Sequence, residues 1–369
     1  MTTNDFEKPS NTPHPFRILA LDGGGIRGAF TAAVLAEIEN RLGSPIGDFF
    51  DLVAGTSTGG IIATGIAAGL PASRIVDFYR QEGPVVFSPR PKIRAGNWRW
   101  RLVAPIARFF TKKVVGISLD DLLQTKYDNE PLRTALTEVF GSKLIGDLIK
   151  CRMVVPAVDI SVGRTKVFKT PHLPNLTRDR HYSLVDVLLG TTAAPTYFPH
   201  ATLRADAVIV DGGLWANNPG LVAYTEAMKI RECCTRPCDP QFAPEDIYVL
   251  SIGTGEPRYS LSPPGSRAGL GWWGPKVFDV SSISQSQGVH FQLKYLLNDR
   301  YRRLNFELPD STWTLDSIER IAPLIHQGQT LAHDNLADLM STFFEERAPG
   351  FVPFEDLRRR MPVEELASC

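Results

Sequence analysis

Short apolar runs alternate with helical patterns through the first 225 residues of the chain. Apolar runs that end at glycine or aspartate predict buried strands at 16–22, 49–55, 151–160, 206–213 and 246–255. Apolar positions at helical spacing predict helices at 28–45, 56–71, 128–141 and 183–194. Strands that alternate with helices favour an α/β fold, with a mainly parallel sheet that helices cover on both faces.

The 369 residues show no clear linker before the C-terminal third. A polar, proline-bearing tail occupies 1–15, and the alternating pattern of strands and helices fills 16–225. We expect 226–369 to complete the same domain, with a strand, an edge strand and closing helices at 319–344.

Composition and charge narrow the classes of protein. Lys plus Arg and Asp plus Glu both number 40, so no overall field favours a nucleic-acid polymer. The hydrophobic fraction of 43% is ample for a core, yet no apolar stretch reaches the roughly 18 residues of a membrane span. The first residues lack the pattern of a secretory leader. The five cysteines are not spaced in pairs as in a disulfide framework, which suits a reducing compartment. We therefore expect a cytoplasmic protein.

The first cluster of glycines follows the first predicted strand. Residues 22–28 read Asp-Gly-Gly-Gly-Ile-Arg-Gly and are called the glycine loop below. Gly23, Gly25 and Gly28 satisfy G-x-G-x-x-G, the pattern of a dinucleotide-binding loop. Such a site also needs an acidic residue at the end of the second strand, which instead ends in Ala-Gly-Thr-Ser, and no Gly-Lys-Ser/Thr forms a P-loop. A nucleotide-dependent oxidoreductase is therefore the less favoured alternative, and we expect no cofactor.

The second strand ends in Gly55-x-Ser57-x-Gly59, the pattern of a nucleophile elbow. Small flanking residues allow a sharp turn that lifts the serine hydroxyl above the sheet, toward the N-terminus of the next helix. If both glycine runs leave the same edge of a parallel sheet, loop amides face the oxyanion that forms when Ser57 attacks a carbonyl. Such donors are worth about 3–4 kcal/mol each in the transition state. The predicted donors are the amides of Gly23, Gly24 and Gly25.

Asp211 closes another apolar strand, in the sequence VIVDGG. An aspartate before two glycines is often a turn former, but at the end of a buried strand, on the same edge of the sheet as Ser57, it also suits a general base. A histidine base is the competing interpretation, as in Ser-His-Asp triads. The candidate histidines, none in a motif of its own, are His200, His290, His326 and His333. The residues alone leave a dyad and a triad open.

Three blocks, DGGGIRG, GTSTGG and DGGLWANNP, together with AAPTYFP at 193–199, resemble the signature blocks of patatin-like phospholipases. The resemblance covers 16–218 and continues through YVLSIGTG. It implies a three-layer α/β/α fold, a membrane phospholipid substrate and a Ser57–Asp211 dyad in place of a triad. It also assigns an oxyanion loop to Gly23, Gly24, Gly25 and Arg27. A non-catalytic storage or scaffold protein of the same kind is the alternative, but it would most simply lack the serine or the aspartate, and both are present.

Residues 83–119 contain no acidic residue, while eight Lys and Arg residues are interleaved with two tryptophans and two phenylalanines. This combination suits the surface of an anionic membrane, and a solvated loop whose cations pair elsewhere is the alternative. Arg27 has a similar pair of interpretations: a surface or structural ion pair, or support for the glycine loop or for a lipid headgroup. We expect transient contact with the membrane surface, with the protein peripheral to the membrane when active.

Two smaller features carry less weight. The turn-rich loop 258–275 contains Trp272 and Trp273 and has no assigned role. Cys233, Cys234 and Cys238 have no partner histidine or cysteine pair at ligand spacing, so we expect no metal site.

The chain also resembles bacterial effectors of anti-phage systems, which cyclic nucleotides switch on and which degrade membrane phospholipids. That resemblance implies a cyclic-nucleotide activator. Ordinary bacterial and plant patatin-like lipases share the same core motifs, so the sequence leaves the trigger open, together with the headgroup, the acyl position and the oligomeric state.

Overall fold

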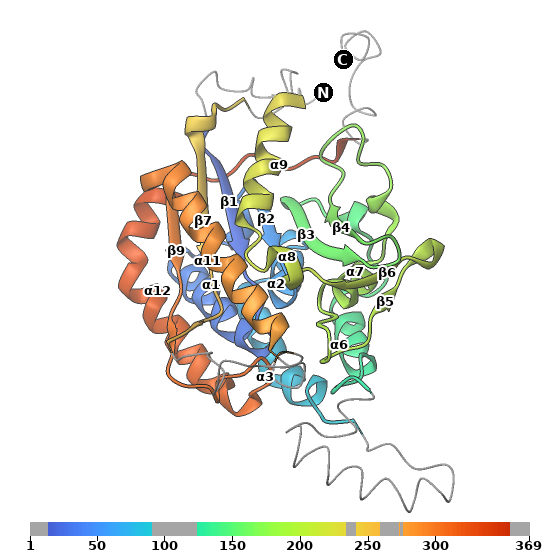
Figure 1. The fold of residues 1–369 in the computed structure, drawn as a ribbon. Helices are drawn as coiled ribbons and strands as arrows, with labels where there is room; N and C mark the ends of the chain where they lie inside the picture. The colour runs from blue at the N-terminus through green and yellow to red at the C-terminus, as the bar shows by residue number, and fades with distance from the viewer. Residues whose placement is uncertain (1–13, 91–123, 234–240, 259–272, 274–275, 355–369) are drawn as a thin grey trace, which may run out of the picture.

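The chain folds as a twisted sheet between two layers of helices (Figure 1). In this computed structural model the described residues are 14–90, 124–233, 241–258, 273 and 276–354. The three-layer α/β/α architecture and the mainly parallel sheet are thereby confirmed.

The central sheet has the strand order β5-β6-β3-β2-β1-β7-β9, and β4 pairs with β3 outside this path. Neighbours among β1, β2, β3, β7 and β9 are parallel, whereas β4 and β6 run antiparallel to β3. A separate short pair is formed by β8 and β10. The strands are β1 Phe16–Leu21, β2 Leu52–Gly55, β3 Arg152–Asp159, β4 Arg164–Lys169, β5 Ala201–Thr202, β6 Val208–Asp211, β7 Ile247–Ile252, β8 Glu256–Pro257, β9 Tyr301–Leu304 and β10 Glu307–Leu308.

Strand β6 departs from the expected parallel order. Because β4 occupies one edge of β3 along 154–159, both β2 and β6 must lie on the other edge. β2 is paired as far as Val154, and β6 comes from the opposite direction and is paired as far as Ala157, about 10 Å further along β3. Ser57 and Asp211 therefore meet between the facing ends of two strands. The expected reason for their proximity, a shared carboxyl edge of parallel strands, is wrong for Asp211.

Alternation along β1 builds a hydrophobic core on each face of the sheet. Leu19 and Leu21 belong to one buried cluster, whereas Phe16, Ile18 and Ala20 belong to the other. This is the period of two that a strand buried on both faces requires.

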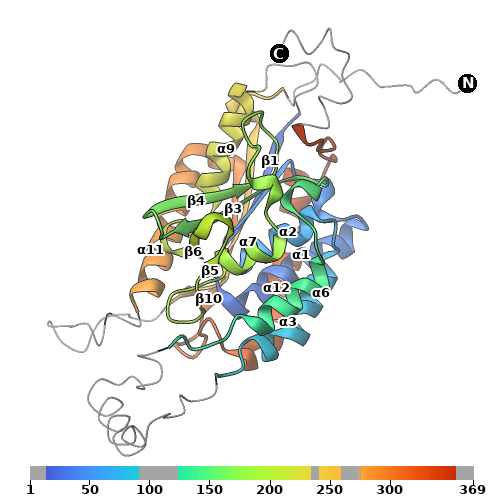
Figure 2. The same ribbon diagram turned by 90° about the vertical axis from the view of Figure 1, so that its right-hand side faces the viewer.

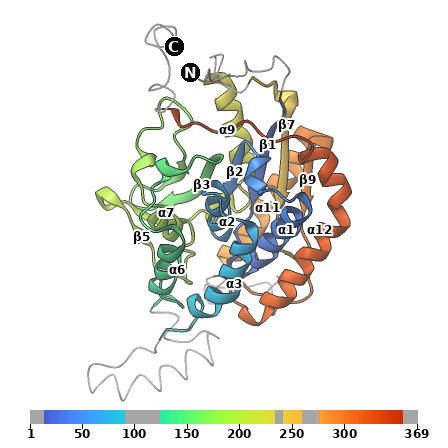
Figure 3. The same ribbon diagram turned by 180° about the vertical axis from the view of Figure 1, so that it is seen from behind.

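Helices cover both faces of the sheet, as the views in Figures 2 and 3 show. Residues of α1, α2, α3, α6, α7 and α12 pack on the Leu19 face, and those of α9 and α11 pack on the Ile18 face. Gly43, with φ of 63°, ends the first helix as the Gly-Ser-Pro sequence predicts. The helices are α1 Gly28–Leu42, α2 Thr58–Ala67, α3 Ala72–Val86, α6 Glu130–Phe140, α7 Leu184–Thr191, α8 Gly213–Ala216, α9 Gly220–Cys233, α11 Val277–Leu297 and α12 Ile321–Phe343.

The C-terminal third extends the same sheet. β7 pairs with β1, β9 pairs with β7, and α12 packs against α1. Several expectations fall outside the described residues: most of the tail 1–15, the greater part of the basic insert 83–119, most of the loop 258–275, and the second and third cysteines of the cluster at 233–238.

Candidate active site

Ser57 stands at the sharp turn between β2 and α2, with φ of 55° and ψ of −123°. Residues other than glycine rarely adopt these backbone angles, so contacts with the surrounding residues must stabilise the strained conformation of Ser57. The turn closes because its two glycines have no side chains. A Cβ on Gly55 would lie 2.0 Å from the carbonyl oxygen of Gly59, and one on Gly59 would lie 2.2 Å from the carbonyl oxygen of Leu21. These are the contacts expected of a nucleophile elbow.

Two threonines anchor the turn, and sequence reasoning missed both. The hydroxyl of Thr191, at the end of α7, accepts a hydrogen bond from the Ser57 amide at 3.0 Å and donates to the carbonyl of Pro156 at 2.7 Å. The hydroxyl of Thr56 donates to the carbonyl of Ala216 at 2.6 Å. In the sequence, the two threonines stand only as hydroxyl residues at the ends of apolar segments, and this position does not indicate which groups they contact.

Asp211 ends β6 with its carboxyl group almost fully buried, at 1% exposure. Its Oδ1 accepts a hydrogen bond from the Gly213 amide at 2.7 Å. Burial raises the pKa of Asp211 to about 7, although the Gly213 amide and the nearby Ser57 hydroxyl lower it in part. Among the described residues, Oδ2 has no partner that meets the geometric criteria of a hydrogen bond. A buried carboxyl oxygen beside a serine hydroxyl, with one lone pair unused, is a competent proton acceptor.

The backbone amides of the first three glycines of the glycine loop fall into two groups: one is hydrogen-bonded within the fold, and two belong to residues that line the cavity. The N–H of Gly23 donates to the carbonyl of Asn217 at 3.0 Å, so Gly23 differs from the expectation that all three glycines donate to an oxyanion. Among the described residues, no acceptor is found for the N–H groups of Gly24 and Gly25, which begin the helical turn Gly25–Arg27. Both glycines line the same cavity as Ser57.

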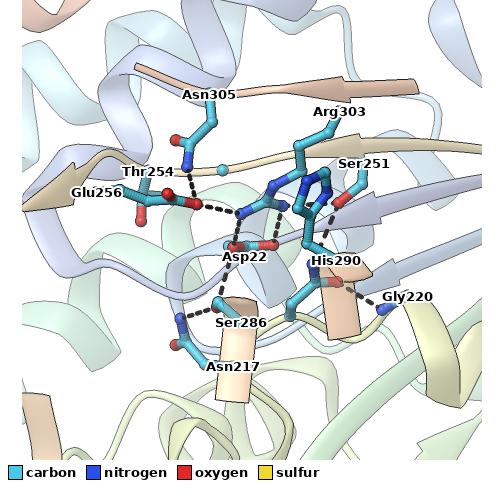
Figure 4. Close-up of polar contacts among 12 residues, drawn as sticks. Asp22, Asn217, Gly220, Ser251, Thr254, Glu256, Ser286, His290, Arg303 and Asn305 are labelled. Carbon is cyan, nitrogen blue, oxygen red and sulfur yellow. Dashed lines mark hydrogen bonds and ion pairs between the residues drawn. The ribbon is translucent and has the colours of Figure 1, made fainter. Parts of the chain in front are cut away.

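A buried ion pair holds the glycine loop to the last strand of the sheet (Figure 4). The Arg303 guanidinium, on β9, donates to both carboxylate oxygens of Asp22, at 2.8 and 2.6 Å. The Ser286 hydroxyl, on α11, donates to the same carboxylate at 3.2 Å. Burial lowers the pKa of Arg303, but the Asp22 carboxylate outweighs this effect and the pKa rises, so the guanidinium stays charged. No motif in the sequence connects these two residues, which are 281 positions apart.

The carbonyl side of the loop is fixed as well. The Thr254 hydroxyl donates to the carbonyl of Gly23 at 2.7 Å, and the Asn217 side chain donates to Ser286 at 3.0 Å. With the Arg303–Asp22 pair, these contacts hold the glycine loop from residues that follow β7 and α8, from α11 and from β9, and so limit the movement of its amides.

Arg27 lies half-buried on the cavity wall. Its Nε donates to the carbonyl of Gly24 at 3.4 Å. Burial raises the pKa of Asp279, on α11, and the positive charge of Arg27 lowers it in part. The contact with Gly24 gives the Arg27 side chain a role in supporting the loop.

One cavity contains Ser57, Asp211 and the glycine loop. Apolar side chains make up much of its lining, among them Ile61, Phe78, Val86, Phe87, Phe198 and Leu308. The described start of the basic insert therefore borders this cavity through Val86 and Phe87. A serine hydroxyl beside a buried carboxyl group, in a pocket with much apolar lining, suits the ester bond of a molecule with a hydrocarbon chain.

None of the seven histidines, all of which are described, lines this cavity. His290 contacts the Tyr301 hydroxyl at 3.2 Å, while His200, His326 and His333 are exposed. The structure therefore brings Ser57 together with Asp211 and with none of the candidate histidines.

In the part of the chain that the structure describes, no group of three His, Cys, Asp or Glu side chains is arranged to hold a metal ion. None of the helices of that part combines the length and the apolar character that a span of the bilayer needs.

Residues 19–224 match the family model of the patatin-like phospholipases. A cGAMP-activated phospholipase of Vibrio cholerae is 33% identical over 360 residues, which cover 91% of this chain and 96% of that protein. A protein of the same name from Pseudomonas aeruginosa is 36% identical and covers 83% of each chain. A third, from Escherichia coli, is 36% identical over 67% of this chain and 64% of its own length.

The order of the three signature blocks, the mainly parallel sheet and the match over more than half of the chain agree with one another. They leave no support for the dinucleotide-dependent oxidoreductase. This chain belongs to the patatin-like phospholipase family and is a lipid acyl-ester hydrolase.

Proposed function

We propose that the chain hydrolyses fatty-acyl esters of membrane phospholipids with Ser57 as the nucleophile and Asp211 as the base. The observation that carries this proposal is the strained Ser57 beside a buried carboxyl group whose Oδ2 has no full hydrogen bond. The apolar cavity and the absence of histidine from its described lining support a dyad.

In the first half of the reaction, Asp211 Oδ2 takes the proton of the Ser57 hydroxyl as Oγ bonds to the ester carbonyl carbon. The carbonyl oxygen becomes an oxyanion. Collapse of this intermediate breaks the bond to the lysolipid oxygen, which leaves with the proton from Asp211, and the acyl group stays on Ser57.

Hydrolysis of the acyl-enzyme repeats these steps with water. Asp211 takes a proton from water as the water oxygen attacks the acyl carbon, and then returns the proton to Ser57 Oγ as the fatty acid leaves. A pKa near 7 suits both roles, because the same group must accept and release a proton near neutral pH.

The free amides of Gly24 and Gly25 are the proposed oxyanion donors. They lie at the start of a helical turn, where backbone N–H groups favour negative charge. Because Asp22, Arg303 and Thr254 fix the loop, the donors require little reorganisation during the reaction.

The proposal is tested with phospholipid vesicles and lipid mass spectrometry on wild-type protein, Ser57→Ala and Asp211→Asn. We expect each substitution to lower the release of fatty acid by about a thousandfold or more, with circular dichroism unchanged. His290→Gln and His326→Gln serve as controls. A loss of equal size in either histidine variant would replace the dyad by a triad.

A cyclic dinucleotide is the proposed activator, since three relatives are named as cGAMP-activated phospholipases. We expect cGAMP to raise phospholipid hydrolysis at least about tenfold over the unliganded rate, and calorimetry to give equal affinity for wild-type protein and Ser57→Ala. Absence of binding to both proteins would remove the activator from the proposal and leave the hydrolase unaffected.

Contact with an anionic membrane is the remaining part of the proposal and rests on the sequence of 83–119. We expect Arg94, Arg99 and Arg101 exchanged together for Glu to weaken cosedimentation with anionic vesicles, most strongly at low salt. Hydrolysis of a water-soluble short-chain ester is the control, because that substrate needs no membrane. Unchanged cosedimentation would argue for a solvated loop.

A further inference from the structure

A second cavity lies beside the active-site cavity, and two residues line both. Ile61, on α2, is almost fully buried at 8% exposure, and Phe78, on α3, is half-buried. The first cavity also contains Ser57. The second cavity is a groove between α3 and α6 and is called the groove below. Figure 2 shows these two helices side by side below the sheet. Ile61 and Phe78 therefore form a wall between the two cavities.

The groove has the chemistry of a site for a hydrocarbon chain. Beyond the two shared residues, its lining includes the apolar residues Gly65, Leu70, Ile75, Ala135, Val139 and Phe140. The charged and amide side chains of the same lining are Arg74, Asp77, Gln81, Glu82 and Glu138. A lining that combines apolar side chains with a few polar ones is typical of a pocket that takes an apolar group.

The direction of α2 connects the nucleophile with this groove. Ser57 immediately precedes α2, and Ile61 and Gly65, one turn apart, lie on one side of that helix. At 1.5 Å per residue, the wall is about 6 Å and Gly65 about 12 Å along α2 from Ser57. A chain that starts at Ser57 and follows α2 meets Ile61 first and the groove next.

We infer that Ile61 and Phe78 set the length of the acyl chain that the enzyme accepts. The acyl chain of the substrate lies along α2 with its end against this wall, and the groove behind the wall takes the end of a longer chain once the wall is cut back. This inference rests on the proposed function, because the acyl group must be bonded to Ser57 for the wall to limit its length.

The test compares kcat/KM for p-nitrophenyl esters from four to eighteen carbons. We expect Ile61→Ala and Phe78→Ala each to raise the ratio of long-chain to medium-chain kcat/KM by about tenfold or more, because small changes in an apolar pocket change discrimination by this factor. A ratio is used because it cancels differences in the amount of folded enzyme. Ile61→Val is the milder variant and should shift the ratio in the same direction by less.

A filled groove should reverse the shift. Val139, on α6, is 38% exposed and lines only the second cavity, so Val139→Trp added to Ile61→Ala should return the ratio toward the wild-type value. Val162→Trp is the matched control, since Val162 is 62% exposed and lines neither cavity. We expect the control to leave the ratio of the Ile61→Ala variant unchanged.

The outcomes separate this inference from the proposed function. If the Ile61 and Phe78 variants are active with the wild-type chain-length profile, or if Val139→Trp fails to reverse the shift, the wall does not set chain length. If Ser57→Ala hydrolyses these esters at the wild-type rate, the proposed nucleophile is wrong.

Discussion

Replacing Asp211 by Asn should stabilise the protein by an amount that grows as the pH rises. Asp211 has a pKa of about 7 in the folded chain, against 3.8 as its ordinary value. Between these two values the unfolded chain loses the proton while the folded chain keeps it, so the wild-type free energy of unfolding falls as the pH rises. A difference of about three units between the two pKa values corresponds to about 4 kcal/mol.

Asparagine avoids this cost because it cannot ionise, and it keeps an oxygen for the Gly213 amide. The assay is urea unfolding of wild-type protein and Asp211→Asn at pH 5 and pH 8, followed by circular dichroism. Over this range the folded carboxyl group passes through its pKa, so the difference between the two free energies of unfolding should increase by about 3 kcal/mol in favour of the variant. The more stable variant should also be inactive, as expected where a site trades stability for function.

Asp206→Asn is the control for this prediction. Asp206 lies five residues before Asp211 and is exposed, and its positive φ of 58° is one that asparagine tolerates. This variant removes one carboxyl group from the same segment without touching the buried site, so its two free energies of unfolding are the reference for the Asp211→Asn values. If the Asp211→Asn difference is the same at pH 5 and pH 8, the Asp211 carboxyl group is already ionised at pH 5 and burial does not govern it.

Three further outcomes follow from the site. Hydrolysis of a soluble ester should rise with pH up to about 7 and then level off, because Asp211 must be ionised to accept the Ser57 proton; a rate that is flat from pH 5 to 8 would argue against this base. Gly25→Ala should lower kcat by about a hundredfold or more, since Gly25 has φ of 57° and a Cβ there would lie 2.2 Å from the Leu315 carbonyl oxygen; wild-type kcat would remove Gly25 from the oxyanion site. Arg303→Met should cost about 3–5 kcal/mol in urea unfolding, because it leaves a buried carboxylate unpaired; a cost below about 1 kcal/mol would show that the pair is not needed.

The sequence predicted the local geometry well where one segment determines it. Gly55 and Gly59 indicate a sharp turn at Ser57, and Gly43 marks the end of the first helix; both features depend on the backbone of adjacent residues. The fold class could be predicted for a similar reason, since the alternation of short apolar runs and helical patterns is read one element at a time.

Contacts between distant segments could not be predicted in the same way. Nothing in VIVDGG tells whether its strand runs parallel or antiparallel, because a short buried run is apolar in either case. The link between Asp22 and Arg303 joins residues 281 positions apart, and the Gly23 amide is engaged by a backbone carbonyl, which no side-chain pattern reveals. The second cavity arises from the packing of α3 on α6 and has no sequence motif at all.

The end-to-end meeting of β2 and β6 has a consequence for the timing of activity during synthesis. The proposed nucleophile is translated early, but its proposed base arrives with β6, and the ion pair that fixes the glycine loop forms only after β9 is made. β9 joins the sheet through β7, which in turn pairs with β1. Such non-local pairing forms slowly. We therefore expect a nascent chain, or a fragment that ends before β9, to carry Ser57 without its finished surroundings and to be inactive as a hydrolase.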